Sequence, residues 1–333
     1  MLFINLKANL GNNLFQYSFL RKVAESHNQN YYLSGDFSQI TKYFDSDFRV
    51  IQSIFKLLIC KVFRQKITVI KPKRKSSGEG IFREDMLSIS DLTLNSEEKY
   101  VLDGWFQYCD YTSPCYISYK KRYLNRVTEY LAASNITALD SYCCIHLRYR
   151  DYFTTDTGRA NQYGWVLPIN YYQNAAKILK SSADPLKFIV VSDDIDLARK
   201  TMSWLPENTH FSTLESPILD MILISLCKYK IITNSTFSWW GARLSFDGAT
   251  TLCPNYLIRS GKQVKISSET YPKNWMRIEF SSDHSPDEIA IYNEHLQNLD
   301  RKQSIKKKSI TWRAFSKIQR LLGSISKRVF HLV

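Results

Sequence analysis

Short apolar runs and longer segments with helical spacing alternate along this chain. Leu2–Leu6 is an apolar run typical of a buried strand, and apolar residues recur at helical spacing after it, up to about His27. The same order returns later, with strand-like runs at 142–145 and 188–191, each followed by a helical segment. This alternation predicts an α/β protein.

Further elements follow from the same reading. The pattern predicts strands at 100–102, 231–233 and 252–254, and helices at about 116–133, 168–179, 195–201 and 218–229. The small polar stretch Ala132–Asn135 is the candidate domain boundary. We therefore expect one α/β domain over 1–135, a second over 136–285, and a C-terminal extension over 286–333.

The stretch Asn234–Arg243 combines a strand end, a Ser/Thr turn and an aromatic helix start. Such a turn collects unpaired backbone N–H groups at the positive end of the helix dipole, which favours an anion. The alternative is an ordinary helix cap above a packed tryptophan pair, and the pattern alone favours that alternative. In the same way Gly11 and Asn12, at the start of the first helix, indicate either close backbone approach to a ligand or a plain turn.

Charged residues follow two of the predicted strands, where open α/β sheets bind ligands. His146, Arg148, Arg150 and Asp151 follow the strand at 142–145, and the two arginines share strand parity, so both could face one site. The planar guanidinium suits a diphosphate. A surface salt-bridge cluster with Asp151 is the equal alternative. Asp193 and Asp194 follow the strand at 188–191. They suit contacts with a ribose or a base, and the alternative is a helix cap.

Together these patterns give the candidate site residues Arg148, His146, Asp151, Gly11, Asn12, Arg150, Asp193, Asp194, Asn234, Ser235, Thr236 and Phe237.

Composition narrows the class of protein. The net charge of +14 is concentrated at the C-terminus, because residues 301–333 carry ten Lys/Arg and no Asp/Glu. The remaining 300 residues are nearly balanced, which argues against nucleic-acid binding. Seven cysteines without a CxxC pair indicate reduced thiols, and six scattered histidines indicate no metal site. With no signal-peptide pattern, we expect a cytoplasmic protein.

The C-terminal tail has an amphipathic pattern. Basic residues fill the other faces of a helix drawn over this segment. Its apolar residues recur every three or four positions: Trp312, Phe315, Ile318, Leu322, Ile325 and Val329. This is typical of an interfacial helix, so 305–333 is expected to bind an anionic membrane surface at the inner face of the cell membrane. A disordered tail or a helix docked on the body is the alternative.

Several blocks resemble the α-1,2-fucosyltransferases of glycosyltransferase family 11, in the family's order. Gly11–Tyr17 resembles the GNQxFQY block, Gly104–Gln107 the GYWQ block, and His146–Tyr152 the HxRRGDY signature. Phe188–Asp194 is similar to the strand ending in SDD. The segment from Asp220 to Ala242 is similar to the block that ends in NSSFSWWGA. These matches span residues from about 9 to 245.

The resemblance implies a GT-B-type fold with two Rossmann-like domains facing a cleft. The N-terminal domain would take the acceptor and the second would hold GDP-fucose. It implies inverting, metal-independent transfer without a cofactor, GDP-fucose being a substrate. The acceptor would be a galactose-type hydroxyl of a glycan. The tail adds to this expectation: an enzyme at the inner leaflet would meet lipid-linked oligosaccharide, which predicts an acceptor in surface polysaccharide assembly.

The resemblance also suggests roles for the candidates. Arg148, with Ser235 and Thr236, would bind the diphosphate and stabilise charge on the departing GDP. His146 would contact the nucleotide or set the loop, and Asp193 or Asp194 would bind guanosine. The resemblance names no general base; on chemistry alone Asp151 is a candidate, with the departing phosphate as the alternative.

Three positions depart from the family pattern: Asn13 stands where Gln is usual, Tyr149 replaces the second Arg of the signature, and Arg150 replaces its Gly. The Tyr149 departure leaves transfer of another GDP-sugar as an alternative. A second alternative treats the tail as the functional part, in a non-catalytic membrane-associated nucleotide-binding module.

Overall fold

A computed structural model describes residues 1–49, 67–76, 82–95, 98–154, 165–181, 186–259, 262–299 and 301. The chain forms two compact units, Met1–Asp283 and His284–Val333. The predicted domain at 1–135 and all but the last two residues of the one at 136–285 fall in the first unit, and the boundary between these domains stays a prediction.

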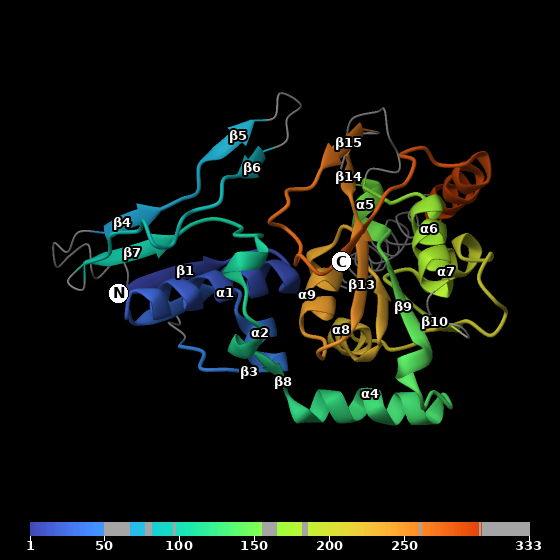
Figure 1. Cartoon of the computed structure of the whole chain (residues 1–333), viewed down its shortest axis with the longest axis horizontal. Coiled ribbons are helices and arrows are strands. Elements are labelled where there is room, and N and C mark those ends of the chain that lie inside the picture. Colours follow the sequence, from blue (N-terminus) through green and yellow to red (C-terminus); the bar gives the residue numbers. More distant parts are fainter. Residues whose placement is uncertain are drawn as a thin grey trace, which may run out of the picture. The chain divides into compact units, whose positions relative to one another are not determined.

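The first sheet lies in the N-terminal part of the chain (Figure 1). Its strands are parallel in the order β2 (Tyr31–Gly35), β1 (Leu2–Leu6), β7 (Lys99–Leu102) and β4 (Ile67–Ile70). Helix α1 (Leu10–Ser26) packs on β1 and is buried along most of its length. The predicted strand–loop–helix opening is therefore confirmed.

The second sheet has six parallel strands, and its order reverses direction inside the sheet. The order is β11 (His210–Phe211), β10 (Lys187–Ser192), β9 (Tyr142–Leu147), β12 (Tyr229–Ile231), β13 (Thr250–Pro254) and β16 (Met276–Ile278). From β9 the chain steps to β10 and β11 on one side, then returns to β12 and β13 on the other. Two parallel sheets with intervening helices confirm the predicted α/β class.

Helices cover both faces of this second sheet. Figure 1 shows α6 (Ile169–Lys180) and α7 (Ile195–Thr201) on one side and α8 (Pro217–Leu226) and α9 (Thr236–Arg243) on the other. This placement follows from right-handed crossovers, because the direction of strand addition changes after β11. The remaining elements are α2 (Ser38–Tyr43), α4 (Lys121–Ala133), α5 (Arg150–Thr154), the short 3₁₀ turns Cys109–Tyr111, Pro114–Tyr116 and Leu139–Ser141, and the strand pairs β3 (Phe44–Asp45) with β8 (Ser118–Tyr119), β5 (Arg74–Ser76) with β6 (Phe82–Glu84), and β14 (Tyr256–Arg259) with β15 (Lys262–Lys265).

Aromatic side chains join the two sheets through α1 and α9. The ring of Phe15 lies 4.5 Å from Trp239 and 5.3 Å from Trp240, measured between centroids. Trp240 is completely buried and Trp239 is 3% exposed. The tryptophan pair therefore packs the core beneath the loop, as predicted, and holds the start of α9 against the first helix.

Some predicted boundaries were wrong. Helix α8 ends at Leu226, not at residue 229, because Cys227 has an extended backbone and Tyr229 already pairs with β9 and β13. That pairing places the strand predicted at 231–233 two residues earlier. Helix α4 begins at Lys121, since residues 118–119 pair as β8 with β3.

The second unit contains a helix over residues 286–299. Its start has a reciprocal cap: Glu288 accepts from the Ser285 N–H at 2.9 Å, and Ser285 Oγ accepts from the Glu288 N–H at 3.2 Å. The amphipathic tail predicted at 305–333 lies outside the described residues. No helix in the described part of the chain is both long and apolar enough to span a membrane.

Candidate functional site

The candidate site lies where the strand order of the second sheet reverses, between β9 and β12. Open α/β sheets bind ligands outside the carboxyl ends of the strands at such a point. Arg148 follows β9, Asp193 follows β10, and Asn234 follows β12. The fold therefore brings together side chains that are more than 80 residues apart in sequence.

Arg148 is held by two carboxylates. Its Nε lies 2.7 Å from Asp151 Oδ1 and 3.3 Å from Asp193 Oδ2. Burial alone would lower the pKa of Arg148, but the carboxylates of Asp151 and Asp193 outweigh it and raise the pKa, so the guanidinium stays charged. Both ion pairs use Nε, and no described residue bonds to the two terminal nitrogens. Those nitrogens keep the fork geometry that suits a phosphate.

Asp193 organises the loop that follows β9. Its carboxylate accepts from the backbone N–H groups of Tyr149 at 2.9 Å and Arg150 at 3.2 Å, in addition to the Arg148 ion pair. Burial raises the pKa of Asp193, and these N–H groups and Arg148 oppose the rise. Asp194 caps α7 by accepting from the Leu197 N–H at 3.1 Å. These bonds support the capping alternative for Asp194, and the predicted guanosine contact of either residue stays a prediction.

The loop Asn234–Phe237 is fixed from two directions. Asn234 donates from Nδ2 to the Trp165 carbonyl at 3.0 Å, and its own carbonyl accepts from Tyr152 Oη at 3.1 Å. Ser235 caps α9, because its Oγ accepts from the Phe237 N–H at 3.3 Å. Tyr152 also lies under Arg148, whose guanidinium carbon is 6.0 Å from the ring centroid. One tyrosine thus connects the arginine with the start of α9.

His146 lies at the carboxyl end of β9 and is only 3% exposed. Its ring centroid is 5.4 Å from that of Phe237. Burial, reinforced by the charge of Arg148, lowers the pKa of His146 to about 3, so the imidazole is neutral at physiological pH. Within the described residues its Nδ1 is buried without a hydrogen-bond partner. The structure therefore makes His146 a neutral group beneath the loop.

Gly11, in the first turn of α1, reaches the same loop, whereas the neighbouring Asn12 bonds to Gln107. A Cβ atom placed on Gly11 would lie 2.6 Å from the carbonyl carbon of Thr236, so only glycine fits this contact. Asn12 accepts at Oδ1 from Gln107 Nε2 at 2.7 Å. The close approach of Gly11 in the structure is to the backbone at the start of α9, and the predicted approach of Gly11 and Asn12 to a ligand stays a prediction.

The strand-parity argument for Arg150 was wrong. Strand β9 ends at Leu147, and Arg150 is exposed and begins α5, so alternation along a strand does not relate it to Arg148. Tyr149, which replaces an arginine of the family signature, is 2% exposed, and its Oη lies 2.6 Å from Thr201 Oγ1. This position faces the interior, and a donor contact by Arg150 stays a prediction.

Two groups of residues were not predicted. Tyr152 and Trp165 fix the Asn234 loop. No sequence pattern predicts these contacts, because each bond is accepted by a backbone carbonyl, of Asn234 in one case and of Trp165 in the other. Lys7, Lys71 and Asp103 form an ion-pair cluster in the first sheet. The rule that ligand-binding residues follow parallel strands points to Lys7 and Asp103, since each follows a predicted strand.

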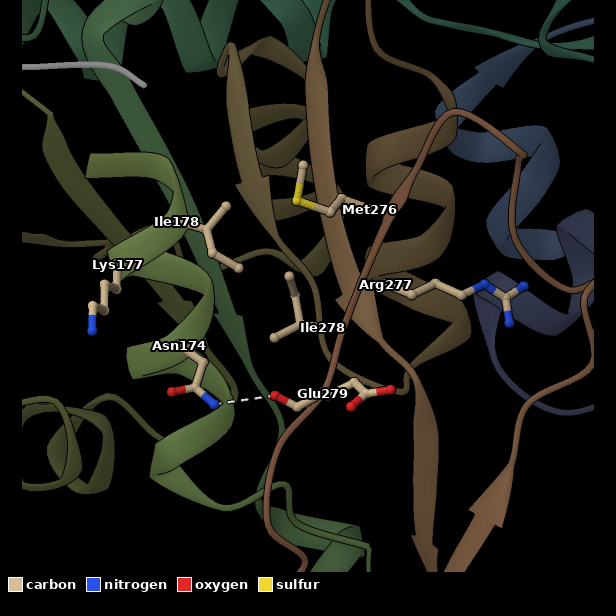
Figure 2. A pocket seen from close by; sticks show the side chains of 7 residues that line it. All are labelled: Asn174, Lys177, Ile178, Met276, Arg277, Ile278 and Glu279. Carbon is tan, nitrogen blue, oxygen red and sulfur yellow. Dashed lines mark hydrogen bonds between the residues drawn. The ribbon is translucent and has the colours of Figure 1, made fainter. Parts of the chain in front are cut away.

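A pocket of about 330 Å³ lies elsewhere, between α6 and β16. Figure 2 shows Ile178, Met276 and Ile278 around its centre, with the guanidinium of Arg277 pointing away. Asn174 Nδ2 donates to the Glu279 carbonyl at 3.1 Å. None of the predicted site residues lines this open, largely apolar pocket, so we do not assign the chemistry to it.

A doubly wound sheet with an arginine and a helix N-terminus at its switch point is the arrangement in which α/β proteins bind nucleotides. Residues 96–279, more than half of the chain, match Glycosyl transferase family 11. The chain therefore belongs to that family, as the sequence motifs predicted.

Two relatives come from Escherichia coli. The O-antigen biosynthesis glycosyltransferase WbnK is 32% identical over 130 residues, which are 38% of this chain and 42% of WbnK. An alpha-1,2-colitosyltransferase is 30% identical over 150 residues, 44% of this chain and 50% of the relative. The chain thus spans half or less of the length of either relative.

Solved structures also show similarity. The NodZ alpha-1,6-fucosyltransferase of Bradyrhizobium, crystallised with GDP, has a TM-score of 0.46 at 14% identity, covering 73% of this chain and 92% of NodZ. POFUT1 with GDP has a TM-score of 0.44 at 11% identity, covering 76% of this chain and 97% of POFUT1.

Proposed function

We propose that this chain transfers L-fucose from GDP-fucose to a galactose-type hydroxyl of a glycan, forming an α-1,2 linkage during surface polysaccharide assembly. Membership in Glycosyl transferase family 11 supports glycosyl transfer. The names of the two relatives, one for O-antigen biosynthesis and one for α-1,2 transfer of a sugar, support the polysaccharide context and the linkage. The transfer inverts the anomeric centre and needs neither a metal ion nor a cofactor.

The observation that carries this proposal is that Tyr152 links Arg148 with the start of α9: its ring lies under the guanidinium and its Oη donates to the Asn234 carbonyl. As the bond between the sugar and the β-phosphate oxygen breaks, negative charge collects on GDP. The terminal N–H groups of Arg148 and the backbone at Ser235 and Thr236 stabilise that charge from fixed positions. The guanidinium is oriented before the donor binds, because Asp151 and Asp193 hold Nε.

The acceptor hydroxyl oxygen attacks the anomeric carbon from the face opposite GDP, and its proton leaves to a base. Asp151 is one base in reach of the site; its Oδ1 is bonded to Arg148, and its side chain is 46% exposed. The departing phosphate is the other. Because Asp151 also holds Arg148, the pH profile of kcat distinguishes the two: if Asp151 is the base, Asp151→Asn removes the fall of kcat at low pH, and if the phosphate is the base, that fall remains.

Product analysis tests the reaction itself. The full chain is incubated with GDP-fucose and a panel of galactose-terminated acceptors, and products are examined by mass and linkage. We expect Arg148→Ala to lower turnover by roughly 10²- to 10³-fold, since one preorganised contact to the developing charge is lost. Arg126→Ala, an exposed arginine on α4, is the matched control. An Arg148→Ala enzyme that keeps most of its turnover refutes the assignment.

Another GDP-sugar is the second candidate donor. One relative is named for transferring colitose, and Tyr149 points to the interior where the family signature has an arginine. Released GDP, measured with GDP-fucose, GDP-colitose and GDP-mannose, ranks the donors. Tight GDP binding without turnover of any sugar nucleotide would favour a non-catalytic nucleotide-binding module.

We also propose that the enzyme works at the inner face of the cell membrane, where lipid-linked oligosaccharide is available. The basic amphipathic pattern of 305–333 supports this. Removing 301–333 should release the protein from anionic vesicles while leaving transfer to a soluble acceptor intact. Full-length protein that does not sediment with such vesicles contradicts the proposal.

A further inference from the structure

Three adjacent parallel strands of the first sheet are each followed by a charged residue at the carboxyl end. Strands β1, β7 and β4 are parallel neighbours, and Lys7, Asp103 and Lys71 are the residues that follow them. Lys7 Nζ lies 2.8 Å from Asp103 Oδ1, and Lys71 Nζ lies 2.9 Å from Asp103 Oδ2. This edge corresponds, in the first sheet, to the edge of the second sheet that carries Arg148.

The cluster is open to solvent and rich in hydrogen-bonding groups. The side chains of Lys7, Asp103 and Lys71 are 36%, 35% and 61% exposed. Each ammonium has three N–H donors, so two on each lysine remain beyond the ion pair with Asp103. Hydrogen bonds from the two lysines lower the pKa of Asp103 to about 2, so it stays ionised and accepts hydrogen bonds. Lys7 Nζ also lies 5.1 Å from the centroid of the Trp105 ring.

The loops that carry these groups have unfavourable backbone conformations. Ala8 has φ of 67° and Phe106 has φ of 55°, in the left-handed region that side chains disfavour. Phe106 is kept there by stacking on Phe19, with ring centroids 3.9 Å apart. A Cβ atom on Gly104 would lie 2.9 Å from Pro72 Cδ. Such strain persists where the surrounding structure fixes it, and it is concentrated at functional sites.

The same loops lead to the candidate donor site. Lys7 is four residues before Gly11, which contacts Thr236 at the start of α9. Gln107, from the loop that carries Trp105, bonds to Asn12 beside Gly11. The loops that carry the cluster therefore lead to the first turn of α1, where Gly11 contacts the loop proposed to hold the donor diphosphate.

We propose that Lys7, Asp103, Lys71 and Trp105 form the acceptor-binding subsite and take a neutral hexopyranose of the glycan. This inference rests on the proposed function. The ammonium groups donate to hydroxyl or ring oxygens, and the Asp103 carboxylate accepts from a hydroxyl. The indole packs on the C–H surface of the sugar. The Asp103 carboxylate neutralises the charge of one lysine and holds both ammonium groups in place, so Asp103 is a positioning residue as well as a ligand.

Steady-state kinetics of the full chain test this subsite. Lys71→Met, Asp103→Asn and Trp105→Ala should each raise the KM for a galactose-terminated acceptor by about tenfold, the effect of losing one good hydrogen bond or contact. The KM for GDP-fucose and the slow hydrolysis of GDP-fucose without acceptor should stay within about twofold. Lys73→Met is the matched control, because Lys73 is also exposed and lies two residues further along.

The outcomes separate the subsite from the reaction. Two results would contradict the subsite assignment while leaving the proposed fucose transfer intact. One is an equal rise in the KM values for donor and acceptor, and the other is an unchanged acceptor KM in Lys71→Met and Trp105→Ala. Saturation-transfer NMR with the acceptor glycoside alone gives a readout that needs no donor. Binding by the wild type that is weakened in Lys71→Met but not in Lys73→Met supports the subsite even if GDP-fucose proves to be the wrong donor. No binding by the wild type refutes it.

Discussion

The Cα of Gly11 lies so close to Thr236 that a Cβ atom there would be 2.6 Å from the Thr236 carbonyl carbon and 2.7 Å from its carbonyl oxygen. This contact joins the first turn of α1 to the first turn of α9. It means that the N-terminal part of the chain sets the position of the loop that we propose binds the diphosphate.

Gly11→Ala should therefore affect both stability and turnover. The added methyl group meets backbone, which cannot rotate away, so we expect a loss of about 1–3 kcal/mol in the free energy of unfolding. Turnover of GDP-fucose should fall as α9 is displaced. Urea unfolding and released GDP measure the two effects.

Gly248→Ala is the matched control for that substitution. Gly248 has φ of +84° and nothing within 4 Å of an added Cβ atom. We expect a backbone cost of roughly 1–2 kcal/mol with normal turnover per folded molecule. If Gly11→Ala behaves like this control, the α1–α9 contact does not position the site.

Tyr149→Arg, which restores the arginine of the family signature, should destabilise the protein. Tyr149 is 2% exposed and bonded to Thr201, so the new guanidinium would place a charge where the protein buries a neutral ring. We expect a loss of roughly 3–5 kcal/mol in the free energy of unfolding, measured by denaturant titration. Tyr149→Phe, which removes only the hydroxyl, should cost about 1 kcal/mol. A stable and more active arginine variant would mean that this position faces the donor.

Protonation of His146 should be coupled to unfolding. Its folded pKa of about 3 lies below the unfolded value of 6.5, so the unfolded state takes up the proton first as pH falls. Stability from this group is complete above about pH 6.5 and is lost as pH falls toward 3, by about 1.4 kcal/mol per pH unit. In urea unfolding, the free energy of unfolding of the wild type should fall relative to that of His146→Leu as the pH is lowered from 7 to 5. A constant difference over that range would contradict the buried neutral imidazole.

Chelation of divalent metal ions should leave turnover unchanged within about twofold. The reason is that, in the function we propose, Arg148 and the start of α9 supply the positive charge that a metal ion provides in other transferases. GDP release is measured with EDTA, and again with added Mg²⁺ or Mn²⁺. Activity that is lost with EDTA and recovered with Mn²⁺ would refute metal-independent transfer.

Strand and helix identities were predictable where the apolar pattern was long and regular. The strand at Leu2–Leu6 and the helix at Ile195–Thr201 have the predicted bounds. The pattern failed near residue 229, because a buried helix and a buried strand are both apolar and only pairing with β9 separates them. It also failed at Arg150, since a strand-end pattern does not show where the chain turns into α5.

The sequence by itself determined the family, the α/β class and the cap-and-core character of Asn234–Arg243, because these depend on local composition and spacing. The tertiary structure decided which side chains meet. It pairs Asp193 with Arg148, buries Tyr149 in the interior, and places Asp103 between two lysines that follow separate strands. Such contacts follow from strand order and helix packing, which bring together residues with no relation along the chain.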